Sequence, residues 1–158
     1  TGDIFLSSNN VVADKKTLGV LTIAGGLFFA VGHVIYVVWL LRFVEGFNCY
    51  TLFAVFGIPA LFVVLSLLKV MKAGKITPLV TLYAAFLGTM LMGAINVYVF
   101  LSPEKIASLI LAGGILFTTS DLVLAYYNFG HTEQTKVKYI YMTTYYAAQI
   151  LFALTLLY

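Results

Sequence analysis

Five long uncharged or nearly uncharged stretches, separated by short polar segments, dominate the chain. Each reaches the roughly 20 residues that a helix needs to cross the hydrocarbon core of a bilayer. In a membrane only helices and closed barrels satisfy the backbone, and the stretches lack the alternation of barrel strands. The pattern therefore predicts an all-α, polytopic transmembrane helix bundle. The stretches run from Thr17 to Leu41, Phe47 to Leu68, Ile76 to Pro103, Ile106 to Gly130 and Tyr139 to Tyr158.

The composition agrees with a protein that lies in lipid. Hydrophobic residues make up 62% of the chain and charged residues 9%, and the mean hydropathy is +1.03. These values lie outside the range of soluble domains. The segment from Thr1 to Leu6 reads like the end of a helix that began upstream, so we expect one transmembrane domain over residues 1–158, from a chain truncated at its N-terminus.

The basic residues predict an orientation. If the five helices alternate, seven of the nine fall on one side, which the positive-inside rule makes cytoplasmic. Juxtamembrane anchoring also explains the net charge of +3, so no nucleic-acid partner is expected. We expect a multi-pass protein of the cytoplasmic membrane in a bacterium, or of the endoplasmic reticulum in a eukaryote. The seven are Lys15, Lys16, Lys69, Lys72, Lys75, Lys136 and Lys138.

Asp121 is the only charged residue between Ile106 and Gly130. An ionised carboxylate in a spanning segment costs several kcal/mol unless it faces a polar interior, finds a partner or stays neutral. Helical spacing places it on a small, polar face, which indicates a site, although a structural aspartate bound across helices is the alternative. That face consists of Gly114, Thr118, Asp121, Ala125 and Asn128.

A second carboxylate lies at a similar predicted depth. TGDIFLSSNN at the N-terminus resembles TSDLVLAYYN, residues 119–128, and pairs Asp3 with Asp121 in segments that run the same way. This predicts a duplicated two-helix unit in parallel orientation. A rival alignment sets AGGLFFAVGH, which ends at His33, against AGGILFTTSD, which ends at Asp121, in opposite directions. We favour the first, because glycine-rich packing motifs recur without common descent.

Several further polar residues lie within the apolar stretches. His33, near the middle of its stretch and on the face of Tyr36, is either a packing residue or a group that orients a carboxyl or relays a proton. Gln149, with Tyr145 and Tyr146 close by, would bind the polar part of a lipid or tie helices together. Asn96 has the same two interpretations.

Motifs for several chemistries are missing from the sequence. No HExxH pattern, GxSxG, P-loop or GxGxxG occurs, so serine-hydrolase and nucleotide-dependent chemistry have no support. Asp3, Asp121 and His33 are ligand types that suit a divalent metal, but without a recognised spacing we expect no metal and no cofactor. Cys49 is the only cysteine and makes no internal disulfide.

Four ordered blocks are spread along the chain: GD with Leu6, GGLFFAVGHVIY (25–36), GGILFTTSDLVLA (113–125) and YYAAQIL (145–151). Together they resemble the YhhN family, also called the transmembrane protein 86 family, and the resemblance covers nearly the whole chain. The resemblance implies about eight helices in a full-length member and lysoplasmalogenase activity, with a lysoplasmalogen or related lysolipid as substrate. It implies intramembrane aspartates at Asp3 and Asp121, supported by His33 and Gln149. Beside these we place Tyr36, Thr118, Ser120 and Asn128 in support, and Tyr145, Tyr146 and Asn96 in substrate binding.

Two carboxyl groups suit the implied reaction. A vinyl ether is cleaved by protonation of carbon and capture of the resulting oxocarbenium ion by water, which resembles the chemistry of two-carboxylate glycosidases. We favour Asp121 as the acid, because its neighbours are more apolar. Five aromatic residues would line an acyl channel. The main alternative is a small proton-coupled transporter or lipid carrier with an Asp/His site at the midplane. The five aromatics are Phe28, Phe29, Tyr126, Tyr145 and Tyr146.

Overall fold

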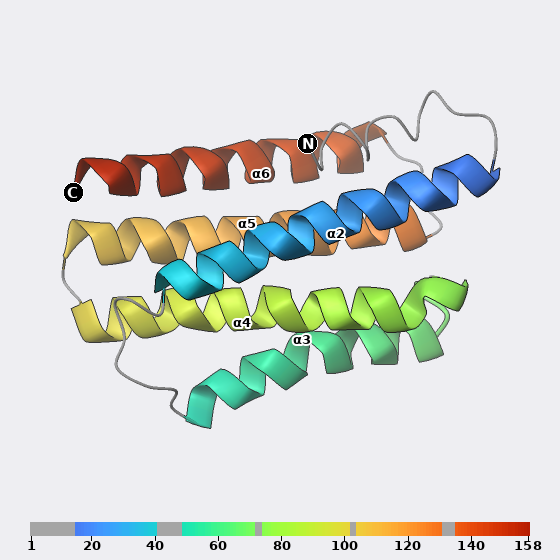
Figure 1. Ribbon diagram of the computed structural model, residues 1–158, viewed down its shortest axis with the longest axis horizontal. Coiled ribbons are helices and arrows are strands. Elements are labelled where there is room, and N and C mark those ends of the chain that lie inside the picture. Colours follow the sequence, from blue (N-terminus) through green and yellow to red (C-terminus); the bar gives the residue numbers. More distant parts are fainter. Residues whose placement is uncertain (1–14, 41–48, 72–73, 102–103, 131–134) are drawn as a thin grey trace.

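The computed structural model describes residues 15–40, 49–71, 74–101, 104–130 and 135–158. These residues form five α-helices and two short 3-10 turns, with no strand among them, which confirms the predicted all-α architecture (Figure 1). The helices are α2 (Lys15–Leu40), α3 (Cys49–Leu67), α4 (Thr77–Leu101), α5 (Lys105–Phe129) and α6 (Thr135–Leu154), and the turns are η1 (Gly74–Ile76) and η2 (Thr155–Leu157).

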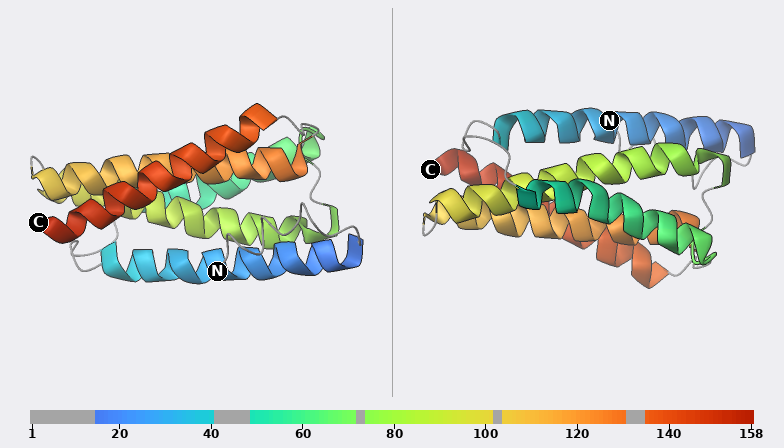
Figure 2. Two further views of the ribbon diagram at one scale, coloured as in Figure 1. Left: turned by 90° about the horizontal axis from the view of Figure 1, so that it is seen from above. Right: turned by 90° about the horizontal axis from the view of Figure 1, so that it is seen from below.

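Four helices pack side by side in the order α6, α5, α4, α3. Helix α2 lies across one face of this row and packs on α4, as the two turned views show (Figure 2). The backbone of α2 stands off from α5, which it reaches only through side chains. The main core lies between α2, α4, α5 and α6, where Leu87, Met90, Val97 and Ile110 are almost fully buried.

Four of the helices, α2, α4, α5 and α6, contain segments long and apolar enough to cross a membrane. Helix α3 has 19 residues and contains Pro59, so at 1.5 Å per residue it is about 28 Å long. The apolar composition and these helices make the chain an integral membrane protein. Helix α6 begins at Thr135, one turn before the apolar stretch at Tyr139. This added turn contains Lys136 and Lys138, and lysine is a good helix former as well as a residue of the membrane surface.

Consecutive helices alternate in direction (Figure 1). The start of α2, the end of α3 and the start of α6 therefore meet at one end of the bundle, which brings Lys15, Lys69 and Lys136 to that end. We call it the lysine-rich end. The alternation on which the predicted orientation depends is thus confirmed, and the cytoplasmic position of this end stays a prediction.

Glycines allow α5 to pack closely against both of its neighbours in the row. A Cβ added at Gly114 would lie 2.8 Å from the Cβ of Ala94 on α4, and one added at Gly113 would lie 2.9 Å from the ring of Phe152 on α6. Real Cβ atoms do not approach so closely, so these two positions exclude larger side chains. The AGG motif before Asp121 therefore fixes the position of α5 in the row.

Candidate functional site

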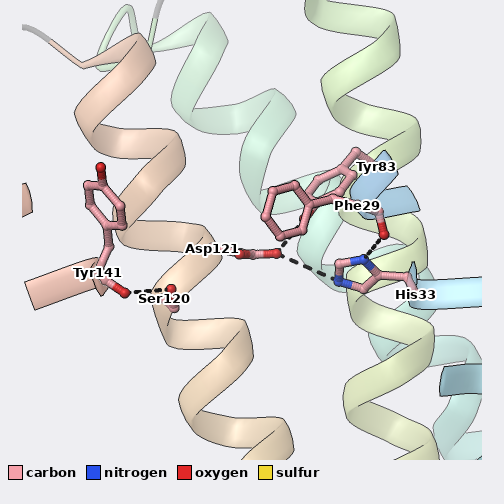
Figure 3. A network of polar contacts seen from close by, with 6 residues as sticks. All are labelled: Phe29, His33, Tyr83, Ser120, Asp121 and Tyr141. Atoms are coloured by element: carbon pink, nitrogen blue, oxygen red, sulfur yellow. Dashed lines mark hydrogen bonds and ion pairs between the residues drawn. The ribbon is translucent and has the colours of Figure 1, made fainter. Parts of the chain in front are cut away.

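Asp121 is buried in the bundle and points toward α2 and α4 (Figure 3). The hydroxyl of Tyr83, on α4, donates a hydrogen bond of 2.5 Å to Oδ2 of Asp121. Nε2 of His33, on α2, lies 3.6 Å from the same oxygen. Three helices thus bring a carboxyl, a phenol and an imidazole together, as the sequence predicted for Asp121 and His33 but not for Tyr83.

The backbone determines the tautomer of His33. Its Nδ1 lies 2.7 Å from the carbonyl oxygen of Phe29, and since a carbonyl can only accept, Nδ1 carries the hydrogen. In a neutral ring Nε2 is then an acceptor, and it faces the carboxyl oxygen of Asp121. Two acceptors repel each other unless a proton lies on one of them. A proton on the carboxyl removes this repulsion, and in an apolar interior a carboxylic acid beside a neutral imidazole costs least.

Tyr83 could have been found from its depth in the membrane. It lies six residues after the start of α4, about 9 Å from the lysine-rich end, and Asp121 lies eight residues before the end of α5, about 12 Å from that end. Because α4 and α5 run in opposite directions, these positions fall at nearly the same level. The ring of Tyr83 also packs edge-on against His33, with centroids 5.1 Å apart.

A cavity of about 190 Å³ lies between α2, α4 and α5 and includes the carboxyl of Asp121 in its wall. It is slightly larger than an engineered protein cavity of about 150 Å³ that binds benzene. Its wall is otherwise apolar apart from Tyr83 and Asn128. The apolar lining consists of Ile23, Gly26, Leu27, Phe29, Ala30, Ile76, Leu79, Val80, Leu82, Phe86, Leu124, Ala125 and Phe129.

The residues of the predicted small and polar face of α5 do not all lie in one place: some line the cavity and one packs against α4. Asp121, Ala125 and Asn128 line the cavity, whereas Gly114 packs against α4. Thr118 is buried, and its hydroxyl has no hydrogen-bond partner in the part of the chain that the structure describes. Ser120, predicted to support the site, instead donates a 2.8 Å hydrogen bond to the backbone oxygen of Tyr141 and ties α5 to α6.

Gln149 lies in a second polar contact that does not border the cavity. Its Oε1 accepts a 3.3 Å hydrogen bond from Tyr36, which follows His33 on α2. The ring of Phe117 separates this pair from the site, since it packs against both His33 and Tyr36. Tyr145 also packs against Phe117, with centroids 5.6 Å apart.

Most of the aromatic residues that were expected around an acyl channel lie elsewhere. Only Phe29 lines the cavity. Phe28, Tyr126 and Tyr146 are exposed on the outside of the bundle, and the side chain of Tyr146 is 55% exposed. Asn96 is buried on α4 and does not line the cavity either. The reason is helical geometry: consecutive residues such as Phe28 and Phe29 point to different faces.

Asp3 and the rest of the segment TGDIFLSSNN lie outside the described residues, so the carboxyl pair and the parallel repeat stay predictions. The rival alignment has a clear spatial result. Its two segments lie in antiparallel helices, and their last residues, His33 and Asp121, meet. Among the described residues, no three His, Cys, Asp or Glu side chains converge where they would hold a metal ion.

Comparison with known proteins identifies one family. No curated protein and no solved structure matches the chain. The model of the YhhN family matches residues 1–156, which is nearly the full length and includes all the blocks that carry the resemblance. The chain belongs to the YhhN family.

Proposed function

We propose that the protein hydrolyses the vinyl-ether bond of a lysoplasmalogen to a fatty aldehyde and a glycerophospho-head group. The observation that carries the proposal is the carboxyl of Asp121 in the wall of an apolar cavity, beside a phenol donor and an imidazole. Such a cavity accepts an alkenyl chain, and the carboxyl of Asp121 is the most acidic group among its lining residues and so the best suited to deliver a proton to carbon.

The reaction needs one proton transfer to carbon and one water. Asp121 protonates the β-carbon of the O–CH=CH group, and the electron pair of the double bond forms the new C–H bond. The resulting oxocarbenium ion takes water at the α-carbon and loses a proton, which gives a hemiacetal. The hemiacetal collapses when its hydroxyl loses a proton to form the aldehyde C=O, the bond from carbon to the glycerol oxygen breaks, and that oxygen takes up a proton and leaves as the alcohol. The proton released from water restores the acid, so the cycle balances.

His33 and Tyr83 suit Asp121 to the role of acid. Because His33 donates through Nδ1 to Phe29, its Nε2 faces Oδ2 of Asp121 as an acceptor, and an acceptor in this position favours a protonated carboxyl. The hydroxyl of Tyr83 holds the same oxygen in place. Asp3, the second family aspartate, is proposed as the carboxylate that stabilises the cation and activates water.

Substitution of Asp121 by asparagine tests the acid. The amide keeps the shape and most hydrogen bonds but cannot protonate carbon, so aldehyde release from a lysoplasmalogen should fall by about 10² to 10⁴. Glu104→Gln is the matched control, because it makes the same carboxyl-to-amide change at an exposed residue that caps the opposite end of the same helix. Both purified variants should stay monodisperse in detergent.

Isotope and substrate controls test the mechanism. In D₂O the aldehyde should carry one deuterium at carbon 2, from the proton delivered to the β-carbon. The saturated alkyl-ether analogue, which has no double bond to protonate, should be inert. If folded Asp121→Asn retains more than about a tenth of the activity, Asp121 is not the acid. Lipid transport into vesicles without any aldehyde would favour the transporter alternative.

A further inference from the structure

The cavity beside Asp121 is bordered by residues of α2 and α4 that are exposed on the outside of the bundle. Its wall on that side includes Leu27 of α2 and Leu82 of α4, whose side chains are 54% and 56% exposed. Exposed leucines on spanning helices face hydrocarbon, because lipid is the solvent at that depth. A chain in the bilayer therefore reaches the carboxyl by crossing these two residues and needs no aqueous route.

The cavity extends along the bundle, from near the lysine-rich end toward the membrane interior. Asp121 lies at its deeper end, whereas Ile76 and Asn128 lie near the lysine-rich end. Asn128 lies seven positions after Asp121 on α5, which is about 10 Å along the helix. A lipid of the leaflet on the lysine-rich side keeps its polar head at that surface and extends its chain inward. Its first chain carbons then come level with Asp121, and the anionic phosphate remains near the lysines.

Gly26, which has no side chain, is the smallest residue in this wall. A Cβ added there meets nothing within 4 Å, so the space beside it belongs to the cavity that Gly26 lines. Ala30 and His33 follow on the same face of α2 at helical spacing. His33 is 1% exposed, and its Nε2 has no hydrogen-bond partner among the described residues. Gly26 and Ala30 thus widen the cavity whose wall includes Asp121, and His33 lies one turn beyond them, outside the lining.

We propose that a single-chain ether lipid enters from the leaflet on the lysine-rich side, between α2 and α4, and that Gly26 keeps open the space its chain occupies beside Asp121. The proposal rests on the proposed function for the nature of the lipid. It adds the side of entry, the pair of helices that form the entrance and the residue that controls it.

The test uses capture of a lipid that the enzyme cannot cleave. The probe is a saturated 1-O-alkyl lysophosphocholine with a diazirine on the chain near the ether. Photolysis with the full chain in bilayers should place adducts within residues 23–30 and 79–86. Gly26→Leu fills the space and should reduce capture at least about tenfold, as expected when extra methylenes are forced into an occupied site. Gly32→Leu is the matched control, since it lies on the same helix, also has open space around its Cβ, and does not line the cavity.

A second measurement tests the side of entry. The charged probe, added to the outside of sealed vesicles, should be captured when the lysine-rich end faces outward and not when it faces inward. Equal capture in Gly26→Leu and Gly32→Leu, adducts confined to other helices, or capture from the opposite face would overturn the proposal. If capture behaves as expected but the wild-type protein releases no aldehyde, the lipid entrance stands and the proposed hydrolysis fails. If Gly26→Leu releases aldehyde as fast as the wild-type protein, the proposed hydrolysis stands and the proposed lipid entrance fails.

Discussion

At the scale of single residues, the contact between Tyr83 and Asp121 leads to a specific expectation. Tyr83→Phe removes one hydroxyl and keeps the ring that packs against His33. Loss of a hydrogen bond to a carboxyl costs about 1.5 to 3 kcal/mol when the group is charged and about 1 when it is neutral, so aldehyde release should fall by about 5- to 150-fold.

The matched control for this change is Tyr141→Phe. It deletes the same hydroxyl from a residue outside the cavity, and Ser120 contacts only the backbone oxygen of Tyr141. The turnover number of each variant should be measured with its thermal stability in detergent. Equal turnover in Tyr83→Phe and Tyr141→Phe would mean that the phenol of Tyr83 has no part in positioning the acid.

The residues of the site were only partly predictable from the sequence. Asp121 and His33 are detectable because an ionisable group in an apolar segment is rare and costly. Tyr83 is not marked by its residue type, because tyrosine is common in this chain and its hydroxyl is inexpensive to place in many positions, and only its depth on α4 points to it. Gln149 was predicted at the site and lies behind Phe117, since sequence spacing gives the face of a helix but not which neighbour covers it.

At the scale of helices, the close approach of α4 and α5 at Gly114 determines the packing of the row. Gly114→Ala would place a Cβ 2.8 Å from that of Ala94, so the helices must move apart, at a cost of about 1 to 3 kcal/mol. Gly32→Ala introduces the same methyl where nothing lies within 4 Å. Unfolding in detergent should therefore show a lower midpoint for Gly114→Ala than for Gly32→Ala.

A compensating substitution makes this test specific. Ala94→Gly in the Gly114→Ala background removes the opposing methyl and should recover part of the lost stability. No recovery, or equal midpoints for the two glycine variants, would contradict the close packing. The helix limits themselves were well predicted, because the apolar stretches must match the thickness of the bilayer. The order of helices in the row was not, since every apolar face is equally compatible with lipid.

At the scale of the whole molecule, the alternating helices place Cys49, the first residue of α3, at the end opposite the lysine-rich end. If the positive-inside rule holds, an impermeant thiol reagent should label Cys49 in intact cells or sealed right-side-out vesicles. Because Cys49 is the only cysteine, Cys49→Ser supplies the blank. Protection in intact vesicles, with labelling only after permeabilisation, would reverse the topology.

The separation of His33 and Asp121 along the chain has a consequence for biosynthesis. The two residues meet in space, but 88 positions separate them in the order of synthesis. At about 5 to 20 residues per second, the ribosome needs roughly 4 to 18 s to extend the chain from one to the other. During that interval the translocon has already received the helix with the imidazole, and the carboxyl that completes the pair does not yet exist. Arrival of α5 is therefore the step at which the contact between His33 and Asp121 can first form.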